Sequence, residues 1–278
     1  MLGRTGRDGS LDVAFERRGS RTVLTRRRFT LPLQALEPVD LEGTGATTLF
    51  LLNPTGGVLG GDVLDTRVEL GAGAWVCLST PSATRVYRSR GVPSLQRVSV
   101  RVGAGARLEY LPDHVIPSPG ARFIQSVQVD LAPGASAMLC DAWSVGRVAR
   151  GEAWLFDLMD SGVTVRDAEG LVFKDRLVLE GACGWGELGA AEGLAYVATF
   201  LCVAPAEPRL ADLVQGLAED IARPEGEARA GITPLARGGV LVRILAGSAP
   251  AMQRTIAQAW ASCRSRLWGL PPKALRKT

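Results

Sequence analysis

The sequence predicts a mainly β protein: a layered, β-solenoid-like stack of antiparallel hairpins with two α-helices in its C-terminal half. Three observations predict this class. A strand–turn–strand pattern recurs about every 30 residues. Further alternating apolar runs follow it, and two segments of helical period come last. Hydrophobic residues make up 46% and charged residues 22%, a composition typical of a globular protein with a sizeable core.

Arginine dominates the N-terminal segment. The first 28 residues hold eight arginines and three acids. The stretch TRRRFTL (Thr25–Leu31) partly matches a twin-arginine export signal, but the following PLQALEPVDLEG has prolines and acids where an apolar region is required. The arginines therefore predict either an exposed strand face or a surface for an acidic partner. A cytoplasmic location is expected, and residues 1–10 are expected to form a flexible arm.

The repeat consists of an alternating strand, a tight turn of glycine, alanine or proline, and a second alternating strand. This pattern is typical of stacked hairpins. Because three copies are visible and they diverge, the sequence predicts a layered architecture rather than a regular solenoid. The copies are VELGAGAWVCL, VRVGAGARLEYL and VDLAPGASAML (Val68–Leu78, Val100–Leu111 and Val129–Leu139).

More alternating runs extend the β region beyond the repeat. They predict strands over Ala153–Met159, Gly162–Asp167 and Leu171–Gly181, and a buried strand is expected over Gly238–Gly247.

The first predicted helix covers residues 207–222 and ends before Pro224. Its apolar residues recur at helical spacing, which places them on one face. They are Leu210, Leu213, Val214, Leu217 and Ile221.

The second predicted helix covers residues 249–268. Ser248 suits its N-cap, Pro250 its first turn, and Gly269 its C-terminal stop. Its apolar stripe predicts either a core face or a partner surface; the stripe is Met252, Ile256, Trp260, Cys263 and Leu267. No linker-like composition separates these parts, so a single domain over residues 1–278 is expected, with residues 270–278 as a tail.

A glycine-rich stretch, LFLLNPTGGVLGGDVL (Leu49–Leu64), raises the question of a phosphate-binding loop. It lacks the Lys-Ser/Thr of a P-loop and the G-x-G-x-x-G spacing, and a strand-like pattern follows it. A nucleotide site is therefore not predicted. Four glycines indicate unusual backbone angles or the close approach of another segment; they are Gly56, Gly57, Gly60 and Gly61.

The residues of common catalytic sites are scarce. The chain has one histidine, His114, and no G-x-S-x-G motif, so a multi-histidine metal site is excluded. His114 is expected to be a loop residue that hydrogen-bonds the backbone, with a weak single metal contact as the alternative. Carboxylate pairs leave a carboxylate-dependent hydrolase or transferase open as an alternative function; they are Asp62 with Asp65, and Glu152 with Asp157.

Five scattered cysteines form no C-x-x-C pair, so they are expected to be reduced and mostly buried. They are Cys77, Cys140, Cys183, Cys202 and Cys263.

Four blocks together resemble the urease accessory protein UreD family, called UreH in some organisms. LNPTGGVLGGDVL is similar to its P-x-G-G-x-x-x-G-D signature, and TPSATRVYRS (Thr80–Ser89) to a T-x-x-x-(T/S)-K-x-Y-R segment, with Arg85 where lysine is usual. YLPDHVIPSPGARF (Tyr110–Phe123) is similar to its L-P-x-x-x-I-P block, and VGRVARGE (Val145–Glu152) to its G-R-x-x-x-G-E segment. The resemblance runs in order from about Leu11 to about Gly269 and so covers nearly the whole chain.

This resemblance implies a non-enzymatic scaffold with a layered β fold and two helices. It implies binding to the urease apoprotein and to a UreF-type accessory protein, which recruits a UreG-type GTPase. It also implies help in nickel delivery to the urease active site, with nickel in transit and no tightly bound cofactor. Nucleic acid is not an expected partner. A membrane is not expected either, since the apolar runs Leu49–Leu52 and Val197–Ala206 are far too short to cross a bilayer.

The resemblance also implies candidate residues for a polar nickel passage. Asp62, Thr84 and Glu152 are its candidates, with Asp62 and Glu152 as the transient nickel ligands. Asp62 has a second interpretation, in which it pairs with Arg85 or Arg88 and holds the glycine-rich turn. The other residues assigned to the passage or to the structural motif are Gly56, Gly57, Gly60, Gly61, Tyr87 and Arg147.

Overall fold

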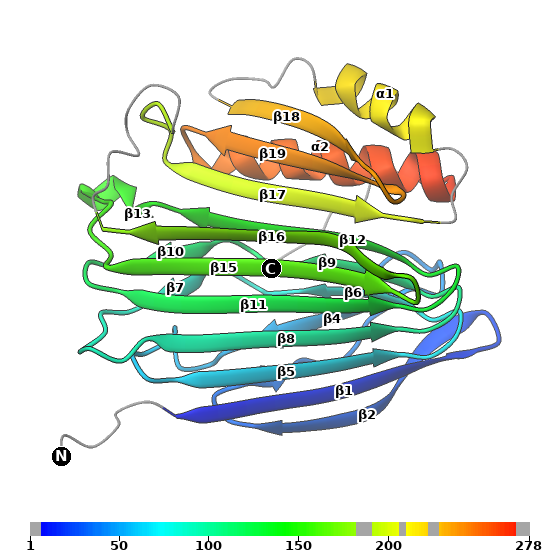
Figure 1. Cartoon of the computed structure of the whole chain (residues 1–278). Coiled ribbons are helices and arrows are strands. Elements are labelled where there is room, and N and C mark those ends of the chain that lie inside the picture. Colours follow the sequence, from blue (N-terminus) through cyan, green and yellow to red (C-terminus); the bar gives the residue numbers. More distant parts are fainter. Residues whose placement is uncertain (1–6, 182–190, 206–209, 222–227, 271–278) are drawn as a thin grey trace.

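The computed structural model describes residues 7–181, 191–205, 210–221 and 228–270. Within these residues, two large β-sheets face each other, and two helices cover the outer side of one of them (Figure 1). A mainly β, solenoid-like stack with two C-terminal-half helices is thus confirmed.

Sheet 1 has its strands in the order β16-β15-β11-β8-β5-β1-β2, so β16 and β2 are its edges. Its strands are β1 (Asp8–Arg18), β2 (Arg21–Thr30), β5 (Val63–Leu70), β8 (Ser94–Val102), β11 (Arg122–Leu131), β15 (Leu158–Asp167) and β16 (Gly170–Glu180).

Sheet 2 follows the order β18-β19-β17-β12-β9-β6-β4-β3, with β10 and β7 attached beside β12. Its strands are β3 (Gln34–Ala35), β4 (Thr47–Leu52), β6 (Trp75–Ser79), β7 (Thr84–Val86), β9 (Arg107–Leu111), β10 (Val115–Pro117), β12 (Ser136–Ser144), β17 (Tyr196–Val203), β18 (Ala228–Leu235) and β19 (Gly239–Ala246). A small ribbon of β13 (Gly146–Arg147) and β14 (Glu152–Ala153) encloses a 3-10 turn, Val148–Arg150.

The strands within each sequence repeat pair differently from the expected hairpins. The first strand of each repeat lies in sheet 1 and the second in sheet 2, so each pairs in parallel with its counterpart in the next repeat. The expectation of antiparallel hairpins is therefore wrong for these three repeats. Inward-facing apolar residues are needed on both strands in either arrangement, so the same alternating pattern fits a hairpin and a sheet-to-sheet corner. Antiparallel pairs do occur outside the repeats, as in β15 with β16 and β18 with β19.

The tight turns of the repeats stack at one end of the sheets. Gly73 N–H donates to the Ala104 carbonyl at 2.8 Å, and Gly105 N–H donates to the Pro133 carbonyl at 3.1 Å. These bonds link the turns of successive repeats and fix the register between the strands that enter and leave them. The connections that carry the glycine-rich stretch and Thr80–Ser89 lie at the opposite end, which we call the loop end.

Two apolar layers hold the molecule together. The first lies between the sheets and includes Phe15, Val98, Leu108 and Leu139. The second lies between sheet 2 and the helices and includes Phe200. Burying side chains of this size contributes about 1.5–3 kcal/mol each.

The helices form where the sequence predicts them. α1 (Leu210–Ile221) buries Leu213, Leu217 and Ile221. α2 (Ala249–Trp268) begins at Ser248, whose hydroxyl accepts from the Ala251 N–H, and ends at Gly269 in the left-handed conformation.

The stripe of α2 is core rather than a partner surface. Met252, Trp260, Cys263 and Leu267 are buried in the layer under the helices, and Ile256 packs against it while partly exposed. Four of the cysteines are buried, and Cys183 lies outside the described residues; the buried ones are Cys77, Cys140, Cys202 and Cys263.

Two expected boundaries differ from those observed. β1 begins at Asp8, so Asp8–Ser10 are strand residues rather than a free arm, because they pair with β2 and β5. Ala153–Met159 is not one strand: β14 ends at Ala153, Trp154 has a φ of 63°, and β15 begins at Leu158. Among the described residues, no helix combines the length and apolar composition needed to cross a bilayer.

Candidate functional site

The four motif blocks lie side by side at the loop end. Val58 of the glycine-rich stretch forms a parallel bridge with Val86 of β7. β7 pairs in parallel with β10, which contacts both β12 and β13. Four segments spread over nearly a hundred residues of sequence thus form one structural unit, and a cavity opens beside it.

Close backbone approach explains two of the four glycines. A Cβ on Gly57 would lie 2.6 Å from Tyr87 Cε2 and 2.7 Å from the Arg85 carbonyl. A Cβ on Gly60 would lie 2.6 Å from the Ser89 hydroxyl and 2.8 Å from its Cα. Neither site admits a side chain without displacing the Thr80–Ser89 segment. The glycine-rich stretch is therefore a packing surface for β7, as its glycine content predicted.

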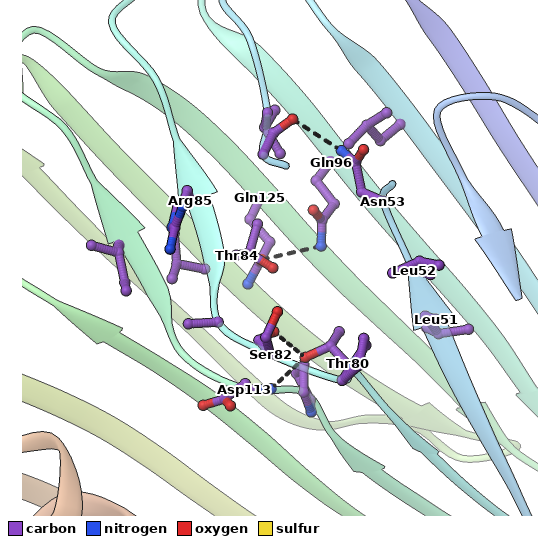
Figure 2. A pocket seen from close by; sticks show the side chains of 18 of the residues that line it. Leu51, Leu52, Asn53, Thr80, Ser82, Thr84, Arg85, Gln96, Asp113 and Gln125 are labelled. Carbon is purple, nitrogen blue, oxygen red and sulfur yellow. Dashed lines mark hydrogen bonds between the residues drawn. The ribbon is translucent and has the colours of Figure 1, made fainter. Parts of the chain in front are cut away.

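The cavity lies between the sheets and has a volume of about 350 Å³. Leu51 and Leu52 line it from β4, and Gln96 and Gln125 extend into it from sheet 1 (Figure 2). Thr80, Ser82 and Asp113 gather at one side, where the Thr80 hydroxyl donates to the Ser82 carbonyl and accepts from the Asp113 N–H (Figure 2). Its other polar lining residues are Asn53, Thr66, Thr84, Arg85, Tyr110 and Asp141.

Asp141 of β12 is one of two carboxylates that line this cavity. Its Oδ1 accepts from Gln125 Nε2 at 3.0 Å, and its Oδ2 accepts from the Ser161 hydroxyl at 2.6 Å. Gln125 also approaches Gln96, with 3.5 Å between the amide nitrogen and oxygen. Gln125 and Asp141 line a second, very small cavity of about 10 Å³ as well, so this hydrogen-bonded group separates two internal spaces.

Burial changes the acidity of two groups at the cavity wall. It raises the pKa of Asp141, while the hydrogen bonds from Ser161 and Gln125 oppose that rise. It also raises the pKa of the Tyr110 hydroxyl, with a further contribution from the nearby Asp141 carboxyl. Tyr110 is therefore neutral at physiological pH.

Asp62, the predicted nickel ligand, is buried outside this cavity lining. Its Oδ1 accepts from the Arg7 N–H at 2.9 Å and its Oδ2 from the Leu59 N–H at 2.8 Å. These bonds tie the turn after Leu59 to the start of β1. Asp62 thus holds the glycine-rich turn through backbone amides, and no ion pair with Arg85 or Arg88 forms among the described residues.

Glu152, the second predicted ligand, faces Arg147 across the β13–β14 ribbon. The Arg147 guanidinium donates to both carboxylate oxygens, at 2.5 and 2.9 Å. The pair is partly exposed. Its two parallel bonds close the loop that carries the fourth motif block.

The remaining predicted residues divide between the cavity and its supports. Gly56, Gly57, Thr84 and Arg85 line the cavity. The hydroxyl of Tyr87 donates to the Gly56 carbonyl at 3.2 Å and so supports the wall from outside. The others do not line it: Gly60, Gly61, Arg88 and Arg147.

His114 is a buried support residue. Its Nδ1 lies 2.9 Å from Asp113 Oδ1, its ring meets Tyr196 edge-on, and its carbonyl accepts from the Thr84 N–H. His114 lies in a loop, as expected, and its backbone carbonyl accepts a hydrogen bond, but its ring contacts the Asp113 carboxylate rather than a backbone group. Across the described parts of the chain, no three His, Cys, Asp or Glu side chains gather as a metal-binding group.

The sequence-based predictions omit the polar residues on the inner strand faces, although a signal for them exists. Gln96 and Gln125 each lie four residues before the valine that opens a repeat, Val100 and Val129, and they are direct cross-strand neighbours. Ser161 follows in the same row on β15. A polar residue recurring at an inward position of successive repeats indicates a wet interior.

The family model of the UreD urease accessory protein matches residues 7–278 of this chain. A urease accessory protein UreD of Ralstonia nicotianae is 35% identical, over 97% of this chain and 92% of the relative. Those of Haloarcula marismortui and Deinococcus radiodurans are 35% and 36% identical, and each alignment covers 99% of this chain. The alignments cover 92% and 97% of those two relatives.

Proposed function

This chain belongs to the family of UreD urease accessory proteins, and we propose that it acts in urease maturation as a non-catalytic scaffold. In this proposal it binds the urease apoprotein and a UreF-type accessory protein, through which a UreG-type GTPase joins the assembly. It helps nickel to reach the urease active site and holds no cofactor tightly. The observation that carries the proposal is the family match over residues 7–278.

The cavity between the sheets supports the nickel part of this proposal. Its lining supplies amide, hydroxyl and carboxylate oxygens, with Asp113 and Asp141 as separate carboxylates. Such hard, scattered ligands hold a hydrated Ni²⁺ weakly, whereas a cluster of thiolates or imidazoles would retain it. Weak binding at successive positions is what a transit route requires. We therefore propose that nickel passes Asp141 on its way through the protein.

Asp62 and Glu152 remain candidates for guiding the ion. Their contacts favour a structural role, because Asp62 accepts from two backbone amides and Glu152 is held by both arms of Arg147. A carboxylate with satisfied oxygens loses those bonds when it turns toward a cation. The two roles are separable by experiment.

The experiment compares three variants: Asp141→Asn, the double variant Asp62→Ala with Glu152→Ala, and Asp65→Asn as a control carboxylate on the outer face of sheet 1. Assembly with the UreF-type protein and urease is measured by co-purification, and nickel-dependent urease activation in the assembled complex follows. We expect Asp141→Asn to assemble normally and to lower activation several-fold, while the control matches the wild type.

The double variant decides the role of the predicted pair. Lowered activation in an intact complex assigns Asp62 and Glu152 to the nickel route, and failed assembly assigns them to structure. Full activation by Asp141→Asn in an intact complex would contradict passage beside Asp141. Absence of any complex with the wild-type chain would contradict the scaffold function itself.

A further inference from the structure

Exposed apolar side chains are concentrated at one end of the stacked sheets. Within the described residues, ten large hydrophobic side chains are exposed, and five of them lie between residues 29 and 41. These five are 39–55% exposed: Phe29, Leu31, Leu36, Val39 and Leu41. We call them the β2–β3 patch. Exposed apolar groups concentrated in this way mark interaction sites on soluble proteins.

The patch belongs to the terminal coil of the stack. β2 is an edge of sheet 1 and β3 an edge of sheet 2, and the two strands contact each other. In Figure 1, β1 and β2 lie at the opposite end of the stack from the helices. Stacked-repeat proteins need a polar outer face on their terminal unit to remain soluble. Here the terminal unit presents apolar side chains instead.

The backbone that carries the patch is held in place by hydrogen bonds. Val39 and Thr48 exchange two backbone bonds of 3.0 and 2.8 Å, and the Leu36 N–H donates to the Phe50 carbonyl at 2.9 Å. Arg27 donates to Glu37 at 2.5 Å across the same surface. An adjoining hollow of about 510 Å³ is lined by residues that include Val39 and Arg27. The patch is thus an ordered surface with a recess for an anchoring side chain.

Charge indicates what covers this surface. Arg21 and Arg28 of β2 are exposed and form no ion pair with another described residue, and the chain carries a net charge of +4. The exposed acids of the same surface are engaged: Glu37 pairs with Arg27, and Asp40 accepts from backbone N–H groups of the following turn. A second copy placed on the patch would bring the unpaired arginines together, which disfavours self-association. We propose that the β2–β3 patch docks a partner protein that presents apolar side chains flanked by carboxylates. This inference rests on the proposed scaffold function and adds to it a surface and a partner chemistry.

The test uses the full chain and two separate probes, the purified UreF-type accessory protein and the purified urease apoprotein. The patch variant is Leu36→Ser with Leu41→Ser. Its matched control is Leu171→Ser with Val178→Ser, which removes comparably exposed apolar groups from β16, at the opposite edge of sheet 1. We expect the patch variant to weaken binding to one probe by about tenfold or more. The control should bind both probes within about twofold of the wild type.

The charge component has its own pair of variants, Arg28→Glu and Arg166→Glu. Both arginines are exposed on sheet 1, but Arg166 lies on β15, beside the edge of the sheet opposite to β2. We expect Arg28→Glu to lower the association rate constant several-fold at low salt, with a smaller effect at high salt, and Arg166→Glu to leave it unchanged. Circular dichroism melting of each variant checks the fold.

The outcomes distinguish failure of the patch assignment from failure of the proposed scaffold function. Wild-type binding of both probes by the patch variant, or equal weakening by the β16 control, would overturn the patch assignment and leave the scaffold function intact. A wild-type dimer that the patch variant abolishes would make a second copy the occupant and overturn the partner chemistry. Failure of the wild-type chain to bind either probe would overturn the proposed function together with this inference.

Discussion

At the scale of single residues, the hydrogen-bond partners of each carboxylate indicate whether its role is structural or chemical. Asp62 accepts two backbone N–H bonds, and Glu152 is held by Arg147. Asp141 accepts from two neutral groups, Gln125 and Ser161, inside a cavity. Neutral partners stabilise a negative charge less than a guanidinium does. Asp141 is therefore held by weaker partners than Asp62 or Glu152, and burial raises its pKa.

The raised pKa of Asp141 gives a prediction about stability. Its burial disfavours the ionised form in the folded protein, so this group lowers the free energy of unfolding as pH rises from the ordinary carboxyl range through the raised pKa. Asp141→Asn removes that cost. We expect the variant to gain on the order of 1 kcal/mol of stability at neutral pH and to lose this gain near pH 4.

Denaturant unfolding at both pH values measures this difference. Asp65→Asn is the control, because Asp65 lies on the outer face of sheet 1 near Arg97 and is partly exposed. A loss of stability in Asp141→Asn at neutral pH would show that the hydrogen bonds outweigh the burial cost. Asp141 would then be a structural residue.

At the scale of elements, the sequence predicts the type of each segment, helix or strand, more accurately than the strands with which it pairs. Helix signals at Ser248 and Gly269 gave both ends of α2, and the repeat located six strands. Strand alternation shows which side chains are buried but not which strand lies alongside. The sheet-to-sheet path and the inward position of Asp141 depend on contacts between distant segments. The packing of the glycines against β7 could be anticipated, because close approach is a local requirement on the backbone.

Helix α2 is fixed to the sheet by a buried ionic group. Arg264 Nη1 lies 2.9 and 2.8 Å from the oxygens of Glu109, and its Nη2 lies 2.9 and 2.8 Å from those of Glu42. Glu109 also accepts from the indole N–H groups of Trp75 and Trp260. Arg264 and Glu109 are fully buried. Removing one partner leaves a buried charge without compensation.

We therefore expect Arg264→Leu to lower the free energy of unfolding by about 3–5 kcal/mol. The matched control is Arg266→Leu on the same helix, whose 3.3 Å pair with Asp220 is partly exposed and should contribute less than about 1 kcal/mol. Urea unfolding followed by circular dichroism measures both. Similar losses in the two variants would contradict the role of the buried group, and adding Glu109→Gln to Arg264→Leu should recover part of the loss.

At the scale of the whole molecule, the two ends of the stack differ in the side chains that they expose to solvent. Helices and ion pairs close the end at β16 to β19, where Arg243 meets Asp175 and Arg237 meets Asp167. The opposite end displays the β2–β3 patch. A chain with this asymmetry is suited to an assembly in which a partner covers the apolar end.

We expect the isolated chain to aggregate or express poorly, and to become soluble when it is co-expressed with the UreF-type partner. Exposed apolar groups at one end favour non-specific association until a partner covers them. Size-exclusion chromatography and light scattering over a range of concentrations check this. A well-behaved monomer at high concentration that binds no partner would argue against a scaffold.

The buried ionic group around Arg264 also determines when the protein can complete its fold during synthesis. Glu42 lies 222 residues before Arg264, so its carboxylate leaves the ribosome long before the guanidinium that neutralises it. Glu109 is synthesised 155 residues before the same arginine. Until the last helix emerges, Glu42 and Glu109 lack the guanidinium of Arg264, and the apolar face of sheet 2 beneath the helices is uncovered. The growing chain therefore cannot complete its fold until synthesis is almost finished, because the last helix supplies contacts that both sheet residues require.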